Sequence, residues 1–352
     1  MSEQIKGKKV FVGLSGGVDS ATSAALLLQD GYDVTGVFIR IVVEGYPCTA
    51  GEDRLDAMRV AAHLKIPFVE IDLSKEYQDR VFVESIKEFK RGLTPNPDVL
   101  CNREIKFGLF YEWARANGAD LVATGHYAQS KDGEFKVSAD KEKDQSYFLW
   151  AVPQDVLKHV LFPIGHLQKP EVRKLAAKFG LLNAQRKDSQ GLCFLGPISV
   201  GDMLKRELNP TPGDLLNEAG EVVGSHDGAV LYTLGQRQGF VLNAHTPDSV
   251  PHYVIAKDIL KNTVTVSSNK FPKDASKTEV TLADINWIGQ VQNGSVSARY
   301  RYRQTLIPAE LDAANNKVTL LEPHYAPEGQ SLVLYKQDRC LGGGAIKEVR
   351  VY

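Results

Sequence analysis

Cys101 lies in a sequence context that would favour a reactive thiol. It follows the segment Thr94-Pro-Asn-Pro-Asp98, whose two prolines fix a rigid approach to a helix. We expect Asp98 to cap that helix, which would place Cys101 in its first turn. A helix N-terminus favours a thiolate, and Arg103 and Lys106 are close in sequence. The simpler alternative is a core cysteine on an apolar helix face.

Cys193 is the second such residue. Glycines flank it in Lys187-Asp-Ser-Gln-Gly-Leu-Cys-Phe-Leu-Gly196, which predicts a mobile loop with an accessible thiol. Taken alone, it is more simply interpreted as an ordinary surface or half-buried loop cysteine. If the fold brings Cys193 and Cys101 to one end of a sheet, one thiol can carry sulfur as a persulfide while the other resolves or activates it.

A third chemical feature is the stretch Lys9-Val-Phe-Val-Gly-Leu-Ser-Gly-Gly-Val-Asp-Ser20. An apolar strand, a Gly/Ser loop and a helix-forming run follow one another here. This layout directs free backbone N–H groups and a helix N-terminus at an anion. The loop closes with Asp19-Ser20 and lacks the lysine of the Walker pattern. The alternative is a Gly/Ser turn before an ordinary helix, but the whole string resembles the PP-loop of the ATP pyrophosphatases.

The elements that must position these residues alternate between strand and helix in the first half of the chain. The predicted strands are 10–12, 34–39, 67–73 and 120–125, and the predicted helices are 19–29, 53–64, 77–90, 98–117 and 170–179. Leu55, Met58, Ala62 and Leu64 should form the sheet-facing side of helix 53–64. This alternation predicts an α/β fold with a doubly wound parallel sheet, whose ligands bind beyond the carboxyl ends of the strands.

The second half is β-rich, and a polar hairpin is expected at 130–140. Linkers are expected at 209–213 and 271–277, which divides the chain into a catalytic domain (1–208), a small β-rich central domain (209–272) and a C-terminal antiparallel β-barrel (273–352). Predicted strands are 221–223, 230–234, 252–256, 279–282, 295–302, 317–321, 331–335 and 344–349.

Composition excludes several classes of protein. The 352 residues carry a net charge of −1, and 43% of them are hydrophobic, as in ordinary globular proteins. No apolar run of about 18 residues is present, and the N-terminus has no signal-like core, which predicts a cytoplasmic protein that does not enter a membrane. The four cysteines form no Cys-x-x-Cys pair, so we expect no zinc site and name no metal ligand.

Seven strings taken together resemble the bacterial tRNA-specific 2-thiouridylases, nearly end to end and in the same order. They are Gly13-Leu-Ser-Gly-Gly-Val-Asp-Ser20, Thr94-Pro-Asn-Pro-Asp-Val-Leu-Cys-Asn102, Ala123-Thr-Gly-His-Tyr-Ala128, Lys143-Asp-Gln-Ser-Tyr-Phe-Leu149, Lys187-Asp-Ser-Gln-Gly-Leu-Cys-Phe194, Thr233-Leu-Gly-Gln-Arg237 and Cys340-Leu-Gly-Gly-Gly344. The PP-loop alone would indicate only the superfamily, whereas the two cysteine segments and the C-terminal strings are more specific.

The resemblance implies ATP-dependent 2-thiolation of the wobble uridine (position 34) of tRNA. The C2 oxygen would be adenylated with Mg²⁺ present, Cys193 would carry the persulfide, Cys101 would help to free the sulfur through a transient disulfide with it, and Asp98 would act as general acid/base. A sulfur-relay protein or cysteine desulfurase would supply the sulfur, and tRNAs such as those for Lys, Glu and Gln would accept it. The implied ATP contacts are Gly13, Leu14, Ser15, Gly16, Gly17, Val18, Asp19, Ser20, Ile39 and Gly125. The implied tRNA contacts are Asn96, Pro97, Asp98, His126, Lys143, Asp144, Gln145, Arg301, Tyr302 and Gln330.

Arg299-Tyr-Arg-Tyr-Arg303 adds an expectation from spacing. On a strand, its three arginines would share one face and its tyrosines the other, which suits phosphate and base-stacking contacts, although a solvated barrel strand would have the same pattern. Two segments depart from the family pattern: Arg40-Ile-Val-Val-Glu-Gly-Tyr-Pro-Cys48 and His226-Asp-Gly228.

Two other functions stay open at the level of sequence. A PP-loop synthetase that adenylates a small molecule would need neither paired cysteines nor a basic strand. A tRNA-binding protein that retains a nucleotide-binding fold would bind ATP and tRNA without releasing pyrophosphate. Loss of sulfur transfer in a Cys193→Ser variant that still binds tRNA would separate the thiolation hypothesis from both.

Overall fold

A computed structural model describes residues 6–47, 49–131, 134–187, 191–196, 198–243 and 250–352. The N-terminal unit is built on a five-stranded parallel sheet in the order β3-β2-β1-β4-β7. The strands are β1 (Lys9–Gly13), β2 (Asp33–Arg40), β3 (Phe68–Asp72), β4 (Leu121–Ala123) and β7 (Val160–Leu161). The central strands β1 and β2 are almost wholly buried, as expected for a parallel sheet covered on both faces.

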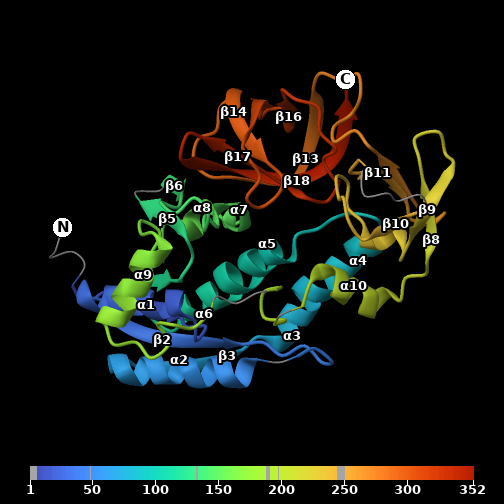
Figure 1. Ribbon diagram of the computed structural model, residues 1–352. Helices are drawn as coiled ribbons and strands as arrows, with labels where there is room; N and C mark the ends of the chain where they lie inside the picture. Colours follow the sequence, from blue (N-terminus) through green and yellow to red (C-terminus); the bar gives the residue numbers. More distant parts are fainter. Residues whose placement is uncertain (1–5, 48, 132–133, 188–190, 197, 244–249) are drawn as a thin grey trace.

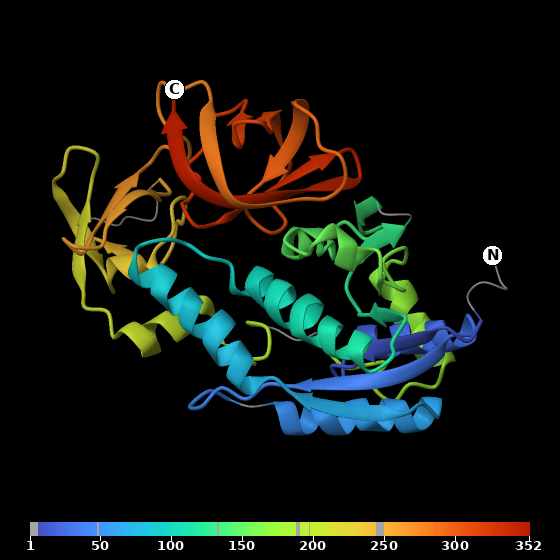
Figure 2. The same ribbon diagram turned by 180° about the vertical axis from the view of Figure 1, so that it is seen from behind.

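Helices cover both faces of this sheet (Figures 1 and 2). One face packs on α1 (Val18–Gln29), α2 (Ala50–Leu64) and α9 (Lys169–Lys178). The other packs on α3 (Ser74–Tyr77), η1 (Gln78–Val83), α4 (Glu84–Lys90), α5 (Pro97–Cys101), η2 (Asn102–Leu109), α6 (Phe110–Ala116) and α10 (Val200–Leu208). The segments η1 and η2 are π-helical turns within longer helices. The doubly wound α/β prediction is confirmed.

The predicted buried side of the second helix is wrong. Leu55 and Met58 are 49% and 38% exposed, and α2 instead buries Ala57, Val60 and Ala61. Small side chains let the helix approach the sheet closely, so its larger apolar residues lie on the rim.

The central unit is a five-stranded sheet in the order β10-β9-β8-β12-β11. Its strands are β8 (Gly213–Leu216), β9 (Val222–His226), β10 (Phe240–Leu242), β11 (Tyr253–Asp258) and β12 (Thr263–Ser267). The predicted strand at 230–234 is wrong, because η3 (Ala229–Leu231) is a short 3₁₀ turn there. The apolar run packs into the central core as a turn, with Tyr232 2% exposed.

The C-terminal unit is a closed antiparallel barrel of six strands, in which β18 pairs with both β17 and β13. The strands are β13 (Thr278–Trp287), β14 (Gly294–Arg299), β15 (Ile307–Asp312), β16 (Lys317–Leu320), β17 (Ser331–Lys336) and β18 (Arg339–Val351). This confirms the expected barrel.

The polar hairpin of the first unit extends this barrel sheet. It consists of β5 (Ala128–Lys131) and β6 (Glu134–Val137), and β6 pairs with β18 at Lys136 and Arg339. The short helices α7 (Ser146–Leu149) and α8 (Gln154–Leu157) lie between the barrel and the parallel sheet (Figure 1). Asn286 of β13 donates to the carbonyls of Trp150 and Val152 at 2.7 and 2.9 Å, which fastens the two units together.

Arg299-Tyr-Arg-Tyr-Arg303 does not form the basic strand that the spacing predicted. β14 ends at Arg299, and the chain then turns, with Arg303 in the left-handed region at φ +61°. Arg299 is buried, so the arginines do not share a surface face. The alternation of residue types reflects a buried ion pair followed by a turn. Within the described residues, no helix is long and apolar enough to cross a membrane.

Candidate active site

The loop between β1 and α1 folds around two hydroxyl groups. The backbone N–H of Ser15 donates to Oγ of Ser20 at 3.2 Å, and Ser20 Oγ donates to the carbonyl of Gly17 at 3.1 Å. Gly16 has φ +76°, which favours glycine, and Gly17 is the N-cap of α1 with no side chain over the helix end. The first N–H groups of α1 are therefore not covered by a capping side chain, which suits an anion-binding loop.

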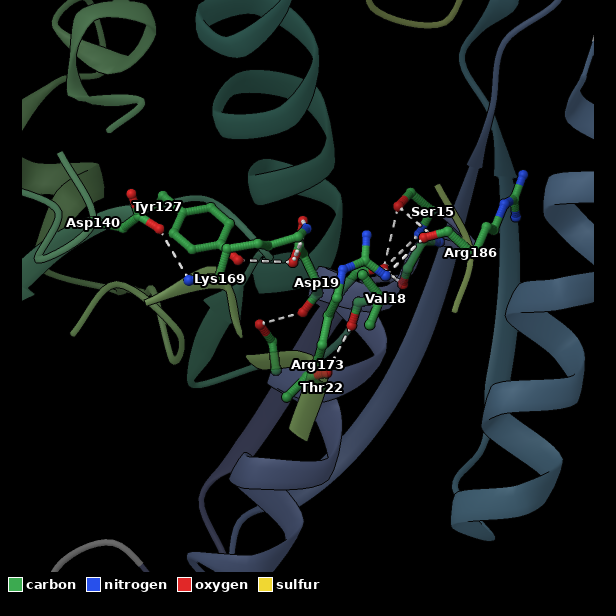
Figure 3. Close-up of polar contacts among 12 residues, drawn as sticks. Ser15, Val18, Asp19, Thr22, Tyr127, Asp140, Lys169, Arg173 and Arg186 are labelled. Atoms are coloured by element: carbon green, nitrogen blue, oxygen red, sulfur yellow. Dashed lines mark hydrogen bonds and ion pairs between the residues drawn. The ribbon is translucent and has the colours of Figure 1, made fainter. Parts of the chain in front are cut away.

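Two residues from the segment after α9, Asn183 and Arg186, hydrogen bond to this loop, and Arg186 is labelled in Figure 3. Asn183 Nδ2 and Arg186 Nη1 donate to the carbonyl of Gly16 at 2.8 and 3.1 Å. Arg186 also pairs with Asp53 and, at 2.9 Å, with Asp56 of α2. Sequence reasoning missed these two residues, because nothing in the loop string indicates which distant segment covers it.

Asp19 lies in the first turn of α1 and faces a lysine from α9 (Figure 3). Lys169 Nζ lies 2.8 Å from both carboxylate oxygens of Asp19, and the Tyr127 hydroxyl donates to the same carboxylate at 3.0 Å. Lys169 is only 8% exposed. The loop contains no lysine of its own, but Lys169 lies beside it. The sequence analysis did not identify this residue.

Gly125 comes shortly after β4, and Ile39 lies near the end of β2, the two strands on either side of β1. A Cβ on Gly125 would lie 2.6 Å from the backbone N of Ser20, so the segment after β4 packs directly on the start of α1. Ile39 lies near the end of β2 and is 8% exposed within the core. The structure therefore brings Gly125 against the loop, whereas Ile39 offers little free surface.

The two chemically distinctive cysteines meet at the carboxyl end of the sheet, on the α5 side. Both cysteines are free, and each thiol shifts the pKa of the other. The backbone N–H of Cys193 donates to Asp98 Oδ1 at 3.1 Å, and its carbonyl accepts from the Tyr77 hydroxyl at 2.8 Å. Both backbone groups of Cys193 are thus fixed by side chains from other elements.

Two expectations about these residues are wrong. The cap of α5 is Asn96, whose side chain accepts from Val99 N at 3.3 Å, and Asp98 is already helical. Cys101 is the last residue of α5, beyond the first turn, and is fully buried, so burial raises the pKa of its thiol. Cys193 is partly exposed, its neighbours Leu192 and Leu195 are buried in the core, and the mobility of this loop stays a prediction.

The pKa of Cys193 is shifted the other way, to about 7, because the Cys101 thiol donates to it and because Lys106 is nearby, against the effect of burial. Burial raises the pKa of Asp98, while the Cys193 N–H and Lys106 oppose that shift. A thiol that ionises near neutrality beside a carboxyl group able to take up a proton is suited to sulfur chemistry with general acid/base help.

Lys106, on η2, joins the thiol pair to the segment after β4. Its Nζ lies 3.4 Å from Nε2 of His126, and its charge is one of the influences that lower the pKa of Cys193. Nδ1 of His126 in turn lies 2.8 Å from Oγ1 of Thr124. Burial and the neighbouring Lys106 keep the pKa of His126 well below its usual value, so the ring is neutral. Arg103, the other cation near Cys101 in sequence, pairs instead with Glu104 at 2.8 Å.

The residues expected to contact tRNA differ in how exposed their side chains are and in whether those side chains are held by other residues. Asp144 is 4% exposed and pairs with Arg299 at 2.5 Å, and His126 faces Lys106. Gln330 accepts from the Tyr147 hydroxyl at 3.0 Å. The partly exposed members of the set are Asn96, Asp98, Lys143, Gln145, Arg301, Tyr302 and Gln330, and Pro97 is buried. Arg301 donates to the carbonyl of Leu234 in the central unit, and Asp144 has an internal structural position.

Models of known protein families match the chain along its length. The "tRNA methyl transferase HUP domain" matches residues 8–197, the "tRNA methyl transferase PRC-barrel domain" matches 201–268, and the "Aminomethyltransferase beta-barrel domain" matches 277–346. Proteins named tRNA-specific 2-thiouridylase MnmA are similar over nearly their whole length. Identity is 43% with that of Lacticaseibacillus paracasei, over 96% of this chain and 94% of the relative, and 41% with that of Lysinibacillus sphaericus, over 97% and 94%.

This chain belongs to the tRNA-specific 2-thiouridylase family. The relative from Streptococcus agalactiae, 40% identical over 97% of this chain and 95% of its own length, agrees with that assignment. Among solved structures, a 4-thiouridine synthetase–RNA complex with bound ATP matches 55% of this chain and 46% of its own, at 20% identity and a TM-score of 0.35.

Proposed function

We propose that this member of the family is a tRNA uridine 2-sulfurtransferase that uses ATP to replace the C2 oxygen of the wobble uridine with sulfur. The observation that carries the proposal is the contact between the Cys101 and Cys193 thiols beside Lys106 and Asp98. A pair of thiols with opposite pKa shifts suits sulfur transfer, and neither a small-molecule synthetase nor a pure binding protein needs it.

The nucleotide half of the reaction belongs to residues 13–20. The fit to a phosphate group rests on Gly16 with its positive φ and on the uncapped start of α1 at Gly17. ATP bound there supplies AMP as the leaving group for the C2 oxygen. Mg²⁺ would accompany the phosphates and keep several water ligands, with Asp19 as the nearest loop carboxylate. The segment at Gly125 supports the loop from the next strand.

The sulfur half belongs to the thiol pair. A persulfide on Cys193 would attack C2 of the activated uridine, forming a C2–S bond as the C2–O bond breaks. The Cys101 thiolate would then attack the Cys193 sulfur of that intermediate. This breaks the S–S bond to the transferred sulfur, leaves the thiocarbonyl on the base and oxidises the two cysteines to a disulfide. Asp98, which holds the Cys193 N–H, would accept and return protons.

RNA binding would use the boundary between the parallel-sheet unit and the barrel. A wobble uridine is unpaired in an anticodon loop, so extruding it toward Asn96 and Pro97 costs little. Lys143, Gln145, Arg301 and Tyr302 would contact the RNA, and Tyr302 packs on Phe148 with ring centroids 4.7 Å apart. Asp144 and Gln330 would position these groups from within.

The partners and the division of the chain are part of the proposal. The tRNAs would include those for Lys, Glu and Gln, and the sulfur would come from a sulfur-relay protein or cysteine desulfurase in the cytoplasm. The functional units would be 1–208, 209–272 and 273–352, which limited proteolysis with mass mapping of the fragments would test.

Mass spectrometry of nucleosides tests the function. Unmodified tRNA is incubated with the protein, Mg-ATP and a small-molecule persulfide, and uridine is examined for exchange of oxygen by sulfur. We expect 2-thiouridine from the wild type, and at least a 100-fold loss in Cys101→Ser and in Cys193→Ser with tRNA binding retained. Cys340→Ser, which alters a buried cysteine of β18, is the matched control and should retain activity.

Other outcomes identify the alternatives. Pyrophosphate release without thiolated uridine would favour a small-molecule synthetase, and ATP and tRNA binding without either product would favour a binding protein. Addition of a methyl group, the chemistry named in two of the family descriptions, would have a different mass and would need no thiol pair.

A further inference from the structure

The segment between α4 and α5 lies where the three units of the chain meet (Figures 1 and 2). A Cβ added to Gly92, at its start, would lie 2.8 Å from the side chain of Ile259 in the central unit. Two residues further on, the backbone N–H of Thr94 donates to the carbonyl of Glu328 in the barrel at 2.8 Å. The chain then enters α5 at Pro97, so the position of α5 depends on where this junction holds the chain.

The barrel contributes the turn 327–330, which we call the barrel turn, to this junction. Its own closing hydrogen bond runs from the N–H of Gln330 to the carbonyl of Pro327 at 3.3 Å. The N–H of Gly329 donates to the carbonyl of Ile346 on β18, and the N–H of Ile346 donates to the carbonyl of Gln330, both at 2.8 Å. The barrel turn is therefore fastened to the barrel wall by two backbone hydrogen bonds.

Gly329 is the point of closest approach between the barrel turn and the segment before α5. Its φ is +83°, which favours glycine. A Cβ at this position would lie 2.8 Å from the Cβ of Leu93 and 2.9 Å from the backbone N of Thr94. Because the turn is held by β18, a side chain at 329 would have to push the segment before α5 away.

A second connection to the barrel runs through α7. Asn102, which directly follows α5, donates from Nδ2 to the carbonyl of Phe148 at 3.0 Å. The neighbouring Tyr147 hydroxyl lies 3.0 Å from Oε1 of Gln330 and 3.2 Å from the carbonyl of Ser331. The barrel turn thus holds the approach to α5 directly and the residue after α5 through α7.

The helix held in this way carries groups on which the proposed function depends. Asn96 caps α5, Asp98 accepts from the N–H of Cys193 at 3.1 Å, and Cys101 is its last residue. A displacement of about 1 Å at a reacting group can lower a rate on the order of 100-fold, even when its cause lies far from the chemistry. The start of α5 is therefore a place where a distant contact can control sulfur transfer.

We propose that Gly329 is a positioning residue for sulfur transfer. By letting the barrel turn contact Leu93 and Thr94, it fixes the start of α5 relative to Cys193 and to the uridine that would be bound there. This rests on the proposed function and deepens it, because the barrel then sets the geometry of the site in addition to its proposed contact with RNA. Gly329 acts through the segment before α5 and takes no part in the chemistry itself.

Hydrogen exchange of the free protein tests the contact without tRNA or ATP. In Gly329→Ala the added Cβ opposes the approach, so the N–H of Thr94 should lose its hydrogen bond to Glu328. We expect deuterium uptake at this amide, followed by mass spectrometry of peptides that span 92–101, to become about tenfold faster or more. Gly220→Ala is the matched control, because Gly220 has φ +82° but an added Cβ meets nothing within 4 Å. It should leave these peptides unchanged.

Thiolation kinetics test the consequence for the reaction. We expect Gly329→Ala to lower kcat for 2-thiouridine formation about tenfold or more, with a change of less than about twofold in the Kd for tRNA. The affinity is retained because the RNA contacts outside α5 are untouched. Gly220→Ala should keep the wild-type kcat and Kd, since it introduces the same backbone strain without the contact.

An unchanged exchange rate at Thr94 or an unchanged kcat in Gly329→Ala would overturn the proposal. A parallel loss of rate and tRNA affinity would overturn it as well, because a merely structural role predicts that result. If Gly329→Ala does not fold, Tyr147→Phe removes only the hydroxyl between α7 and the barrel turn, and it should lower kcat about threefold or more at unchanged Kd. A wild-type protein that forms no 2-thiouridine would overturn the proposed function and with it the role in sulfur transfer, while the exchange rates would still decide the contact itself.

Discussion

At the scale of single residues, Gly125 is a tightly constrained position of the nucleotide site. A Cβ there would lie 2.6 to 2.9 Å from the backbone of Asp19 and Ser20, and neither strand nor helix can yield easily. We expect Gly125→Ala to displace the start of α1 and to weaken ATP binding at least tenfold, about 1.4 kcal/mol, by isothermal titration calorimetry. Gly51→Ala, where the added Cβ meets nothing within 4 Å, should leave affinity unchanged. Equal affinities for both variants would contradict the packing argument.

At the scale of elements, the ion pair between Arg299 and Asp144 joins the end of β14 to the segment before α7. Both side chains are buried, and Arg299 also donates to the Tyr335 hydroxyl at 3.0 Å. Arg299→Met should destabilise the protein by about 3–5 kcal/mol in urea unfolding, because it leaves a buried carboxylate unpaired. Arg350→Met removes an exposed pair with Glu348 and should cost at most about 1 kcal/mol. An equal loss of unfolding free energy in both variants would show that the buried ion pair contributes no more to stability than the exposed one.

The helices and strands also show which features of the fold could be predicted from the sequence and which could not. Local signals sufficed for the parallel sheet and the phosphate loop, because strand patterns and glycine spacing are encoded nearby. They failed at Arg299–303, where alternation suggested a strand face but a partner 155 residues away, Asp144, buries the first arginine. They also missed Lys169 and Arg186, since only the folded chain places α9 and the following segment against the loop.

The same limit holds at the thiol site. The cysteines were found by their neighbours in sequence, but the direction of each pKa shift was not, because burial of Cys101 outweighs the helix end that was expected to ionise it. Lys106 was noted only as a nearby charge. Its influence on the pKa of Cys193, and the hydrogen bond from the Tyr77 hydroxyl to the Cys193 carbonyl, depend on a segment that starts far along the chain.

At the scale of the whole molecule, each structural unit contains a buried neutral histidine: His126 by the parallel sheet, His226 in the central sheet and His324 in the barrel. Burial lowers the pKa of all three below its usual value. In His226, Nδ1 already accepts from Gly228 N at 3.0 Å, so a proton there would cost that hydrogen bond. The unfolded chain therefore binds protons more readily than the native one, and stability must fall as pH drops below about 6.5.

This loss should be distinguishable from acid unfolding driven by carboxylates, whose lowered pKa values, as at Asp202 and Asp227, place their effect below about pH 4. We expect the thermal unfolding midpoint, followed by circular dichroism, to fall steadily from pH 7 to pH 5. His226→Gln should be less stable than the wild type at pH 7 but should show a shallower fall, because one of the groups that gain a proton on unfolding is gone. His166→Gln, at an exposed position, should keep the wild-type slope. A midpoint that is flat between pH 7 and pH 5 would mean that these rings take up protons as readily in the native protein as in the unfolded chain, and Lys106 would then face a ring that becomes a cation in this range, where the present geometry gives it an acceptor.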